Sequence, residues 1–228
     1  MSLILNIDTA TETAHVSIAR DGIVLKDSHN ASQKDHASFL QPAIRQITIE
    51  AAVALKDIDA IAVTAGPGSY TGLRVGLASA KGLCYALNKP LIMLNTLEVL
   101  TASALYQQRD KAANGSTLFC PMIDARRMEV FTAIYNEQLV MILPPQAMVL
   151  EEQSFKEQLE KHKLLFFGSG AAKWIAICHH PNTFFDTVSI LPEAMSQLSY
   201  LSLSRQQLAD LAYSEPFYLK EFQIVIKK

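Results

Sequence analysis

The pattern of hydrophobic and polar residues at the start of the chain is typical of β-strands. Residues 3–8 form a short apolar run typical of a buried strand, and residues 15–20 alternate between apolar and polar positions. Asp21 and Gly22 come next, and this pair predicts a tight hairpin because both residues tolerate a positive φ. We therefore expect the chain to return as another strand over residues 23–27.

A helix, a buried strand and a second helix are predicted next. Apolar residues recur at helical spacing after Asp35, a suitable N-cap, and Pro42 within this stretch predicts a kink or a late helix start. Residues 60–65 form another apolar run typical of a buried strand. The glycine-rich stretch 66–72 follows and leads into a helix that we expect to end near Asn88.

The second half of the chain repeats this order of elements. A strand ends in Asp124, as the first strand ends in Asp8. The expected elements here are strands at 117–124, 129–135 and 139–143, a helix at 151–162, a strand running into a second glycine turn at 164–170, and a helix opening at 171–177. A last helical stripe is expected from Leu203 to Ala212, ending before Pro216.

The repeated pattern predicts an α/β protein with two mixed-sheet domains, each flanked by helices and facing the other across a cleft. This is the arrangement of the actin-like group (ASKHA, ribonuclease H-like), in which ligands lie at the carboxyl ends of strands. A polar, loop-like stretch marks the boundary, which gives domains at residues 1–105 and 106–228. The last segment is also able to pack back on the first domain.

Composition and charge narrow the range of functions that this chain can have. The chain has 228 residues, of which 50% are hydrophobic and 18% charged, so it can bury a core. Its net charge of −2 argues against unaided binding of nucleic acid, which usually needs a basic excess. Three scattered cysteines without a CxxC pair indicate free thiols in the cytoplasm. We expect neither a signal peptide nor a membrane-spanning segment.

The glycine-rich loop matches neither common nucleotide fingerprint. It lacks the Lys-Ser or Lys-Thr pair of a Walker A loop, and Thr71 stands where the dinucleotide motif has its third glycine. Pro67 also removes one amide donor from the loop. A phosphate on the amides that precede the helix remains an alternative.

Small residues line one face of the helix after this loop, because they recur every four positions. Such a face allows close approach by another element, which is either the chain's own sheet or a helix of another subunit. Both alternatives stay open. The candidate interface residues are Gly72, Leu73, Gly76, Leu77, Ala80 and Cys84, with Phe39 from the preceding helix.

Several motifs in one order resemble those of the TsaB family, also called YeaZ. They are LILNIDTATETAHVSI from residue 3, AGPGSYTGLRVGLASAKGL from residue 65, MIDARRMEVFTAIY from residue 122 and EPFYLK at 215–220. The family belongs to the tRNA threonylcarbamoyladenosine group and carries an older glycoprotease (M22) label. The resemblance implies an actin-like fold. Met128 departs from the pattern, because relatives more often have glycine in that turn.

The resemblance also implies a role and partners. The expected role is that of a non-catalytic subunit in forming N6-threonylcarbamoyladenosine beside the anticodon of tRNAs that read codons beginning with A. The expected partners are the catalytic paralogue TsaD, which carries iron or zinc, and the ATPase TsaE. ATP is then used by the assembled complex, tRNA is contacted only through the complex, and the chain forms a homodimer when alone. No tightly bound cofactor is expected.

One comparison separates this chain from the catalytic paralogue. In the paralogue, the segment after the glycine-loop helix resembles VNHLEGHLLA, and the two histidines in it, four residues apart, bind the metal. This chain has LNTLEVLTAS from Leu94, with Thr96 and Leu100 at the histidine positions. Leucine offers no donor atom, so this resemblance implies no metal site and no catalytic residues here. A metallopeptidase is therefore disfavoured.

A second function class is an ATP-dependent kinase or ATPase of the actin-like fold. In that group, residues in the corresponding turns hold magnesium and nucleotide. The simpler interpretation is that they cap strand ends and form hairpin turns. The candidate nucleotide-binding residues are Asp8, Thr9, Thr11, Asp124, Gly168, Ser169 and Gly170.

Overall fold

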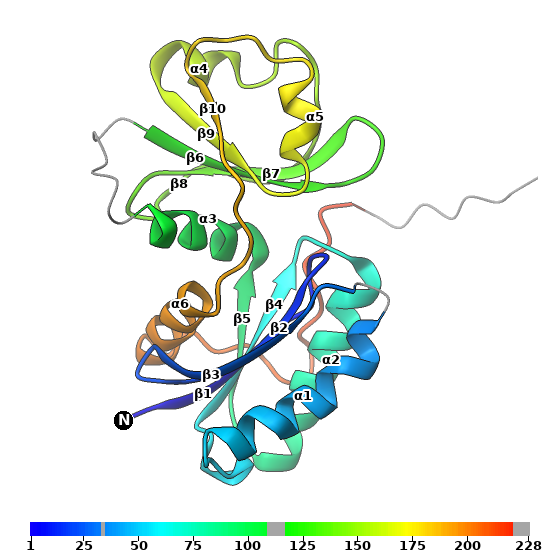
Figure 1. Ribbon diagram of the computed structural model, residues 1–228, viewed down its shortest axis with the longest axis vertical. Helices are drawn as coiled ribbons and strands as arrows, with labels where there is room; N and C mark the ends of the chain where they lie inside the picture. The colour runs from blue at the N-terminus through cyan, green and yellow to red at the C-terminus, as the bar shows by residue number, and fades with distance from the viewer. Residues whose placement is uncertain (33–34, 109–116, 221–228) are drawn as a thin grey trace, which may run out of the picture.

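The computed structural model describes residues 1–32, 35–108 and 117–220, which contain two five-stranded mixed sheets (Figure 1). The first sheet has the order β3-β2-β1-β4-β5, with β1 (Leu3–Asp8), β2 (Ala14–Arg20), β3 (Ile23–Asn30), β4 (Ala60–Gly66) and β5 (Leu91–Asn95). The second has the order β10-β9-β6-β7-β8, with β6 (Thr117–Asp124), β7 (Glu129–Tyr135), β8 (Met141–Val149), β9 (Lys163–Phe167) and β10 (Thr183–Phe185).

The two sheets share one topology. In the first, β1 pairs antiparallel with β2 and parallel with β4, and in the second β6 pairs antiparallel with β7 and parallel with β9. β3 and β5 occupy the edges of the first sheet as β8 and β10 do in the second. The repeated pattern therefore confirms the predicted α/β class with two actin-like domains.

Helices cover both faces of the sheets (Figure 1). α1 (His36–Glu50) and α2 (Tyr70–Leu87) pack on one face of the first sheet, and a 3-10 turn, η2 (Leu55–Asp57), lies between α1 and β4. The opposite face carries α3 (Thr96–Gln107) and α6 (Pro192–Ser204). α4 (Lys156–Lys161) and α5 (Ala171–Ile175) belong to the second domain. None of the described helices combines the length and the apolar character needed to cross a membrane.

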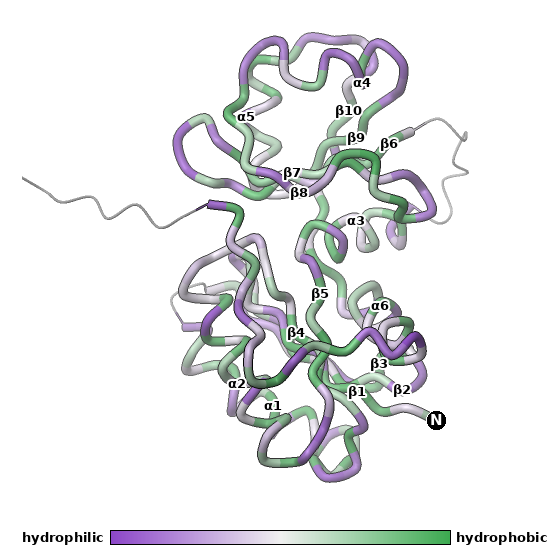
Figure 2. Tube along the Cα trace, turned by 180° about the vertical axis from the view of Figure 1, so that it is seen from behind, coloured by the Kyte–Doolittle hydropathy of each residue, from purple (hydrophilic) through white to green (hydrophobic). Residues whose placement is uncertain are grey.

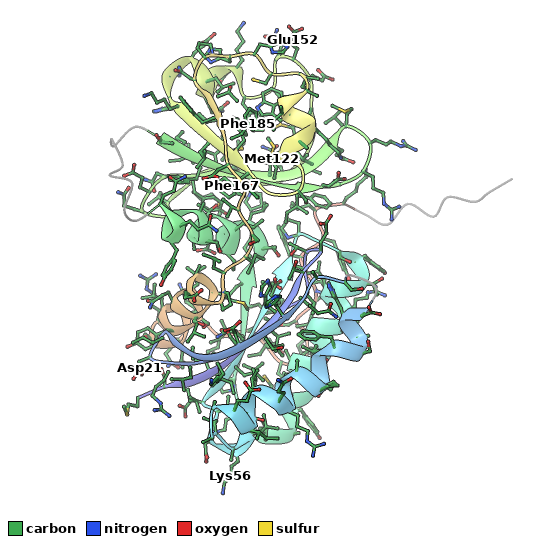
Figure 3. The ribbon with its side chains drawn as sticks, viewed as in Figure 1. Asp21, Lys56, Met122, Glu152, Phe167 and Phe185 are labelled. Carbon is green, nitrogen blue, oxygen red and sulfur yellow. The ribbon has the colours of Figure 1, made fainter. Side chains whose placement is uncertain are left out.

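One hydrophobic cluster joins the two domains through α3. It includes Ile4 and Ala62 from the first sheet and Phe119 and Phe167 from the second, all of them buried. In Figure 3, Phe167 lies on the side of the second sheet near α3, whereas Asp21 and Lys56 lie at the far end of the first domain. The domains are thus held together at α3 by shared apolar packing, which is the dominant favourable term in folding.

The first domain follows the sequence expectations closely. Asp21 and Gly22 have φ values of 50° and 81°, which confirms the hairpin turn between β2 and β3. α1 begins directly after Asp35 and continues through Pro42, so the alternative of a late start is wrong. α2 ends at Leu87 with Asn88 in the left-handed conformation, one residue from the expected end.

The end of the chain differs from expectation. The predicted helix over 203–212 is wrong, because α6 ends at Ser204 and residues 205–220 form neither a helix nor a named strand. The Ala209 amide instead donates to the Leu91 carbonyl at 2.8 Å, on the edge strand β5. An edge strand offers unpaired backbone groups, and here they outweigh local helix propensity. The boundary predicted near residue 105 is followed by residues 109–116, which lie outside the described residues.

Candidate functional site: the glycine loop and its helix

Asp8 ends β1 and is fully buried. Its Oδ1 accepts hydrogen bonds from the Thr64 hydroxyl at 2.6 Å and from the Ala10 amide at 3.0 Å, whereas Oδ2 has no partner among the described residues. Burial raises the pKa of Asp8, and the hydrogen bonds together with nearby His15 and His36 oppose that shift. This carboxyl is an internal group, and it is not presented to solvent as a magnesium ligand would be.

Two glycines of the loop lie against the turn that follows β1. A Cβ atom added to Gly68 or Gly72 would come within 3.0 Å of a backbone carbonyl oxygen, that of Ala10 or Thr9 respectively. Real Cβ atoms essentially never come so close, so only glycine allows this contact. The Thr9 hydroxyl also donates to the Gly72 carbonyl at 2.7 Å. The loop therefore holds another part of its own chain.

The amides of the loop are also used internally. The Ser69 amide donates to the Ala10 carbonyl at 2.7 Å, and the Leu73 amide donates to the Ser69 carbonyl at 2.8 Å. Ser69 is the N-cap of α2, and its hydroxyl accepts from the Gly72 amide at 3.3 Å. A phosphate at this helix end would have to displace these bonds, so the geometry does not favour the phosphate alternative.

The corresponding turn of the second domain brings Asp124 and Ser169 together. The Asp124 amide donates to the Ser169 hydroxyl at 3.1 Å, and the carboxylate pairs with Lys173 at 2.8 Å. Partial burial alone would raise the pKa of Asp124, but the hydrogen bond and charge of Lys173 bring it below its usual value. The charge of Asp124 is thus already compensated by a lysine of its own domain.

The glycines of this second turn pack as the first set does. Gly168, at a φ of 93°, lies against the Met122 carbonyl, and a Cβ on Gly170 would come within 3.0 Å of Val130. Thr11, the remaining nucleotide candidate, donates from its hydroxyl to the Thr13 carbonyl. All of these candidate residues have structural roles, and nucleotide binding stays a prediction.

The small-residue face of α2 faces the chain's own sheet. Gly72, Leu73, Gly76, Leu77, Ala80 and Cys84 are all buried. Leu77, Ala80 and Cys84 join the core beneath α1, and a Cβ on Gly76 would collide with the Thr9 hydroxyl. Phe39 is half-buried against the same core. Of the two alternatives, the structure has packing on the sheet, so these side chains are not available for direct contact with a second subunit.

The opposite side of α2 carries small residues that sequence reasoning did not assign to an interface. Ala78, Gly82 and Ala86 recur every four residues and are exposed. A Cβ added to Gly82 would meet no atom within 4 Å. Tyr85 and Ile49 of α1 are 84% and 69% exposed. The sequence did mark this face, because glycine at position 82 lowers helix stability relative to alanine and therefore needs a reason. The four-residue pattern alone, however, does not tell which face of α2 is buried.

The two positions that resemble metal ligands of the paralogue are buried. Thr96 is 0% and Leu100 3% exposed, and the Thr96 hydroxyl has no hydrogen-bond partner among the described residues. Within residues 1–32, 35–108 and 117–220, no group of three or more His, Cys, Asp or Glu side chains is placed to hold a metal ion.

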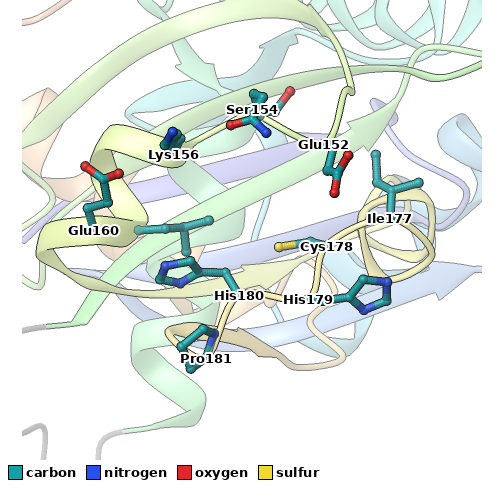
Figure 4. Close-up of a pocket in the computed structure, with 11 residues that line it drawn as sticks. Glu152, Ser154, Lys156, Glu160, Ile177, Cys178, His179, His180 and Pro181 are labelled. Atoms are coloured by element: carbon teal, nitrogen blue, oxygen red, sulfur yellow. The ribbon is translucent and has the colours of Figure 1, made fainter.

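A cavity of about 400 Å³ in the second domain is lined by several titratable side chains, including Cys178, His179 and His180. Figure 4 shows the two imidazole rings pointing away from each other. His180 accepts a hydrogen bond from the Asn182 amide through Nδ1, so its neutral form carries the proton on Nε2. This ring is therefore poorly placed to share an ion with its neighbour.

The turn after β6 tolerates Met128 without strain. Within this turn, Arg126 and Arg127 have positive φ values of 68° and 48°, whereas Met128 does not. Its carbonyl accepts from the Leu150 amide at 2.7 Å. The absence of glycine at this position therefore places no strained residue there.

Comparison with known proteins now gives the family. The family model described as TsaD, tRNA N6-adenosine threonylcarbamoyltransferase, matches residues 22–220. The TsaB protein of Bacillus subtilis (strain 168) is 29% identical over 226 residues, covering 95% of this chain and 93% of the relative. This chain belongs to the TsaB/YeaZ group of the TsaD family. TsaB of Escherichia coli (strain K12) is 36% identical over 134 residues, covering 58% of this chain and 54% of that one.

The solved structures agree with the TsaB/YeaZ assignment. The structure of YeaZ from Pseudomonas aeruginosa matches with a TM-score of 0.78 at 28% identity, covering 96% of this chain and all of that one. The match spans both domains, so the likeness is not limited to the motifs around the glycine loop. It supports the TsaB/YeaZ fold for the whole described chain.

Proposed function

We propose that this chain is a non-catalytic partner subunit in the synthesis of N6-threonylcarbamoyladenosine in tRNA. It supports a TsaD-like paralogue together with a TsaE-like ATPase, and it acts next to the anticodon of tRNAs that read codons beginning with A. Support comes from the family and from the names of its relatives in B. subtilis and E. coli, which are tRNA threonylcarbamoyladenosine biosynthesis proteins.

The observation that carries the non-catalytic role is the presence of Thr96 and Leu100 at the two positions where the resemblance places the metal-binding histidines of the paralogue. Thr96 and Leu100 are buried, and leucine has no donor atom for a metal. Asp8 is internal and Asp124 is paired with Lys173, and neither arrangement favours a carboxylate that holds a magnesium nucleotide. The transfer chemistry is then supplied by the paralogue, ATP is consumed by the assembled complex, and tRNA is contacted through the complex.

We place the partner surface on the outer faces of α1 and α2. We call it the outer helical face, and it consists of Ile49, Ala78, Gly82, Tyr85 and Ala86. Exposed large apolar side chains beside small residues allow a second helix to approach closely and to bury them. The same face would hold a second copy of this chain when the paralogue is missing.

The proposal is tested by reconstituting the transfer in vitro. A TsaD-like paralogue and a TsaE-like ATPase from the same source should modify tRNA slowly without this chain and much faster with it. This chain alone should give no product, because it lacks the metal ligands of the paralogue.

The competing functions, a metal enzyme or a kinase, require bound metal or ATP turnover in the isolated chain. Under our proposal, we expect elemental analysis after dialysis to find no stoichiometric iron or zinc, and a phosphate-release assay to find no ATP turnover. The reasons are the absent histidine pair and the internal state of Asp8. A metal content of one per chain would favour a metallopeptidase or a catalytic paralogue. ATP turnover that is lost on Asp8→Asn would favour the kinase.

A further inference from the structure

The described chain after α6 runs across the first domain and reaches the second domain at its last described residue, Lys220 (Figure 2). Residues 209–220 form no helix or named strand, yet they contact four elements, namely β5, α2, β4 and β7. Their backbone begins at the edge of β5, where the Ala209 amide donates to the Leu91 carbonyl at 2.8 Å. Lys81 of α2 then holds the segment, since its Nζ donates to the carbonyls of Ala212 and Ser214, each at 3.1 Å.

The middle of the segment sits on the glycine loop. The Phe217 amide donates to the Ala65 carbonyl at 2.6 Å, and the Phe217 carbonyl lies so close to Gly66 that a Cβ there would come within 3.0 Å. Gly66 has a φ of 119°, a conformation that side chains other than glycine rarely adopt. The first glycine of the loop is therefore shaped to receive this segment.

Aromatic contacts attach the next residue to the start of α2. The Tyr218 hydroxyl accepts a hydrogen bond from Arg74 Nε at 3.1 Å, and its ring lies 5.4 Å from that of Tyr70. The Arg74 guanidinium also lies 4.1 Å from the centre of the Tyr70 ring. Up to Tyr218, the segment thus belongs to the first domain.

The last described residue reaches the other domain. Lys220 forms an ion pair with Glu129 at the start of β7, and these side chains are 43% and 17% exposed. Glu129 is itself held in place, because Lys173 Nζ donates to its carbonyl at 3.0 Å. Exposed ion pairs are weak and are screened by salt. This one ion pair with the second domain is therefore easier to break than the several backbone, side-chain and aromatic contacts with the first.

The described end of the chain, drawn in red in Figure 1, lies on the other side of the molecule from α3. At α3, the domains share a hydrophobic cluster that cannot open without exposing buried side chains. The domains are thus joined firmly on one side and by a single described ion pair on the segment's side. Rotation about α3 would separate Lys220 from Glu129 first.

We propose that residues 209–220 form a strap that positions the second domain relative to the first, with the Lys220–Glu129 ion pair as its releasable end. The strap concerns this chain alone and does not depend on which protein binds it. It also gives a physical role to the EPFYLK motif at 215–220. The motif fits the glycine loop with Phe217 and Tyr218 and reaches the second domain with Lys220.

The distance between the domains tests this proposal. Labels for single-molecule fluorescence transfer are placed by Lys56→Cys and Glu152→Cys, at opposite ends of the molecule (Figure 3), in a Cys178→Ser background. Cys84 and Cys120 are buried and remain. At about 0.1 M salt the full chain should give one narrow distribution, and Lys220→Ala should lose it. Salt near 1 M should broaden the parent distribution in the same way, because charges are then screened within about 3 Å.

Two further variants make the result specific to the ion pair. The double variant Lys220→Glu with Glu129→Lys should recover the narrow distribution, since it restores the pair with its charges exchanged. Lys161→Ala removes an exposed positive charge from α4 of the second domain, the domain that contains Glu129, and should leave the distribution narrow. A narrow distribution that survives Lys220→Ala would overturn the proposal. A double variant as broad as the single one would overturn it as well.

Discussion

Replacing Gly72 by alanine is expected to lower the melting temperature of the isolated chain by roughly 2–12 °C. A Cβ at this position would overlap the Thr9 carbonyl oxygen, a backbone atom that cannot rotate away. Overpacking of this kind typically costs about 1–3 kcal/mol, and 1 kcal/mol shifts the melting temperature of a chain of this size by about 2–4 °C. Thermal unfolding followed by circular dichroism measures the effect.

The matched control is Gly82→Ala in the same helix. A Cβ at Gly82 meets no atom within 4 Å, and alanine is a better helix former than glycine by up to about 1 kcal/mol. The melting temperature of this variant should therefore stay the same or rise by a few degrees. Equal changes in the two variants would contradict the account of α2, in which one small-residue face is buried and the other is open.

Replacing Gly82 by arginine is expected to weaken binding of the TsaD-like paralogue by at least about tenfold, or about 1.4 kcal/mol. The new side chain projects from the outer helical face into the space that a partner helix would fill, and tightly packed interfaces tolerate added volume poorly. The fold should be unaffected, because position 82 is open and arginine favours a helix more than glycine does. Titration calorimetry with the purified paralogue gives the affinity.

An exposed position on another helix controls for the added charge. Leu201→Arg places arginine on α6, where Leu201 is 41% exposed and on the opposite face of the first sheet from α2. This variant should bind the paralogue as the parent chain does. If Gly82→Arg binds with unchanged affinity, or if Leu201→Arg weakens binding as much, the partner surface is not the outer helical face.

The sequence predicted most of the fold because its local patterns agree with the tertiary structure. The apolar runs at 3–8 and 117–124 became central strands, and Asp21-Gly22 formed the hairpin turn. Two repeats of one order of elements produced two sheets of one topology. At each of these places, local propensity and burial favour the same conformation.

The sequence could not identify the contacts that define the candidate site. Four-residue spacing shows that Gly72 and Gly76 share a face with Ala80, but both faces of α2 carry small residues at this spacing. Only the position of Thr9, more than sixty residues earlier, decides which face is buried. The helix predicted over 203–212 was wrong for a similar reason, because the segment pairs with the edge of β5 through the Ala209–Leu91 hydrogen bond instead of continuing as a helix.

The most direct test of the partner-subunit account is the initial rate of threonylcarbamoyl transfer to tRNA in the reconstituted system. The paralogue with the ATPase is measured alone, with this chain, and with the Gly82→Arg variant, and this chain is also measured without the paralogue. The account predicts a large stimulation by the parent chain, little by the variant, and no product from the chain by itself. Product formed by this chain alone, or a rate that does not change when it is added, would contradict it.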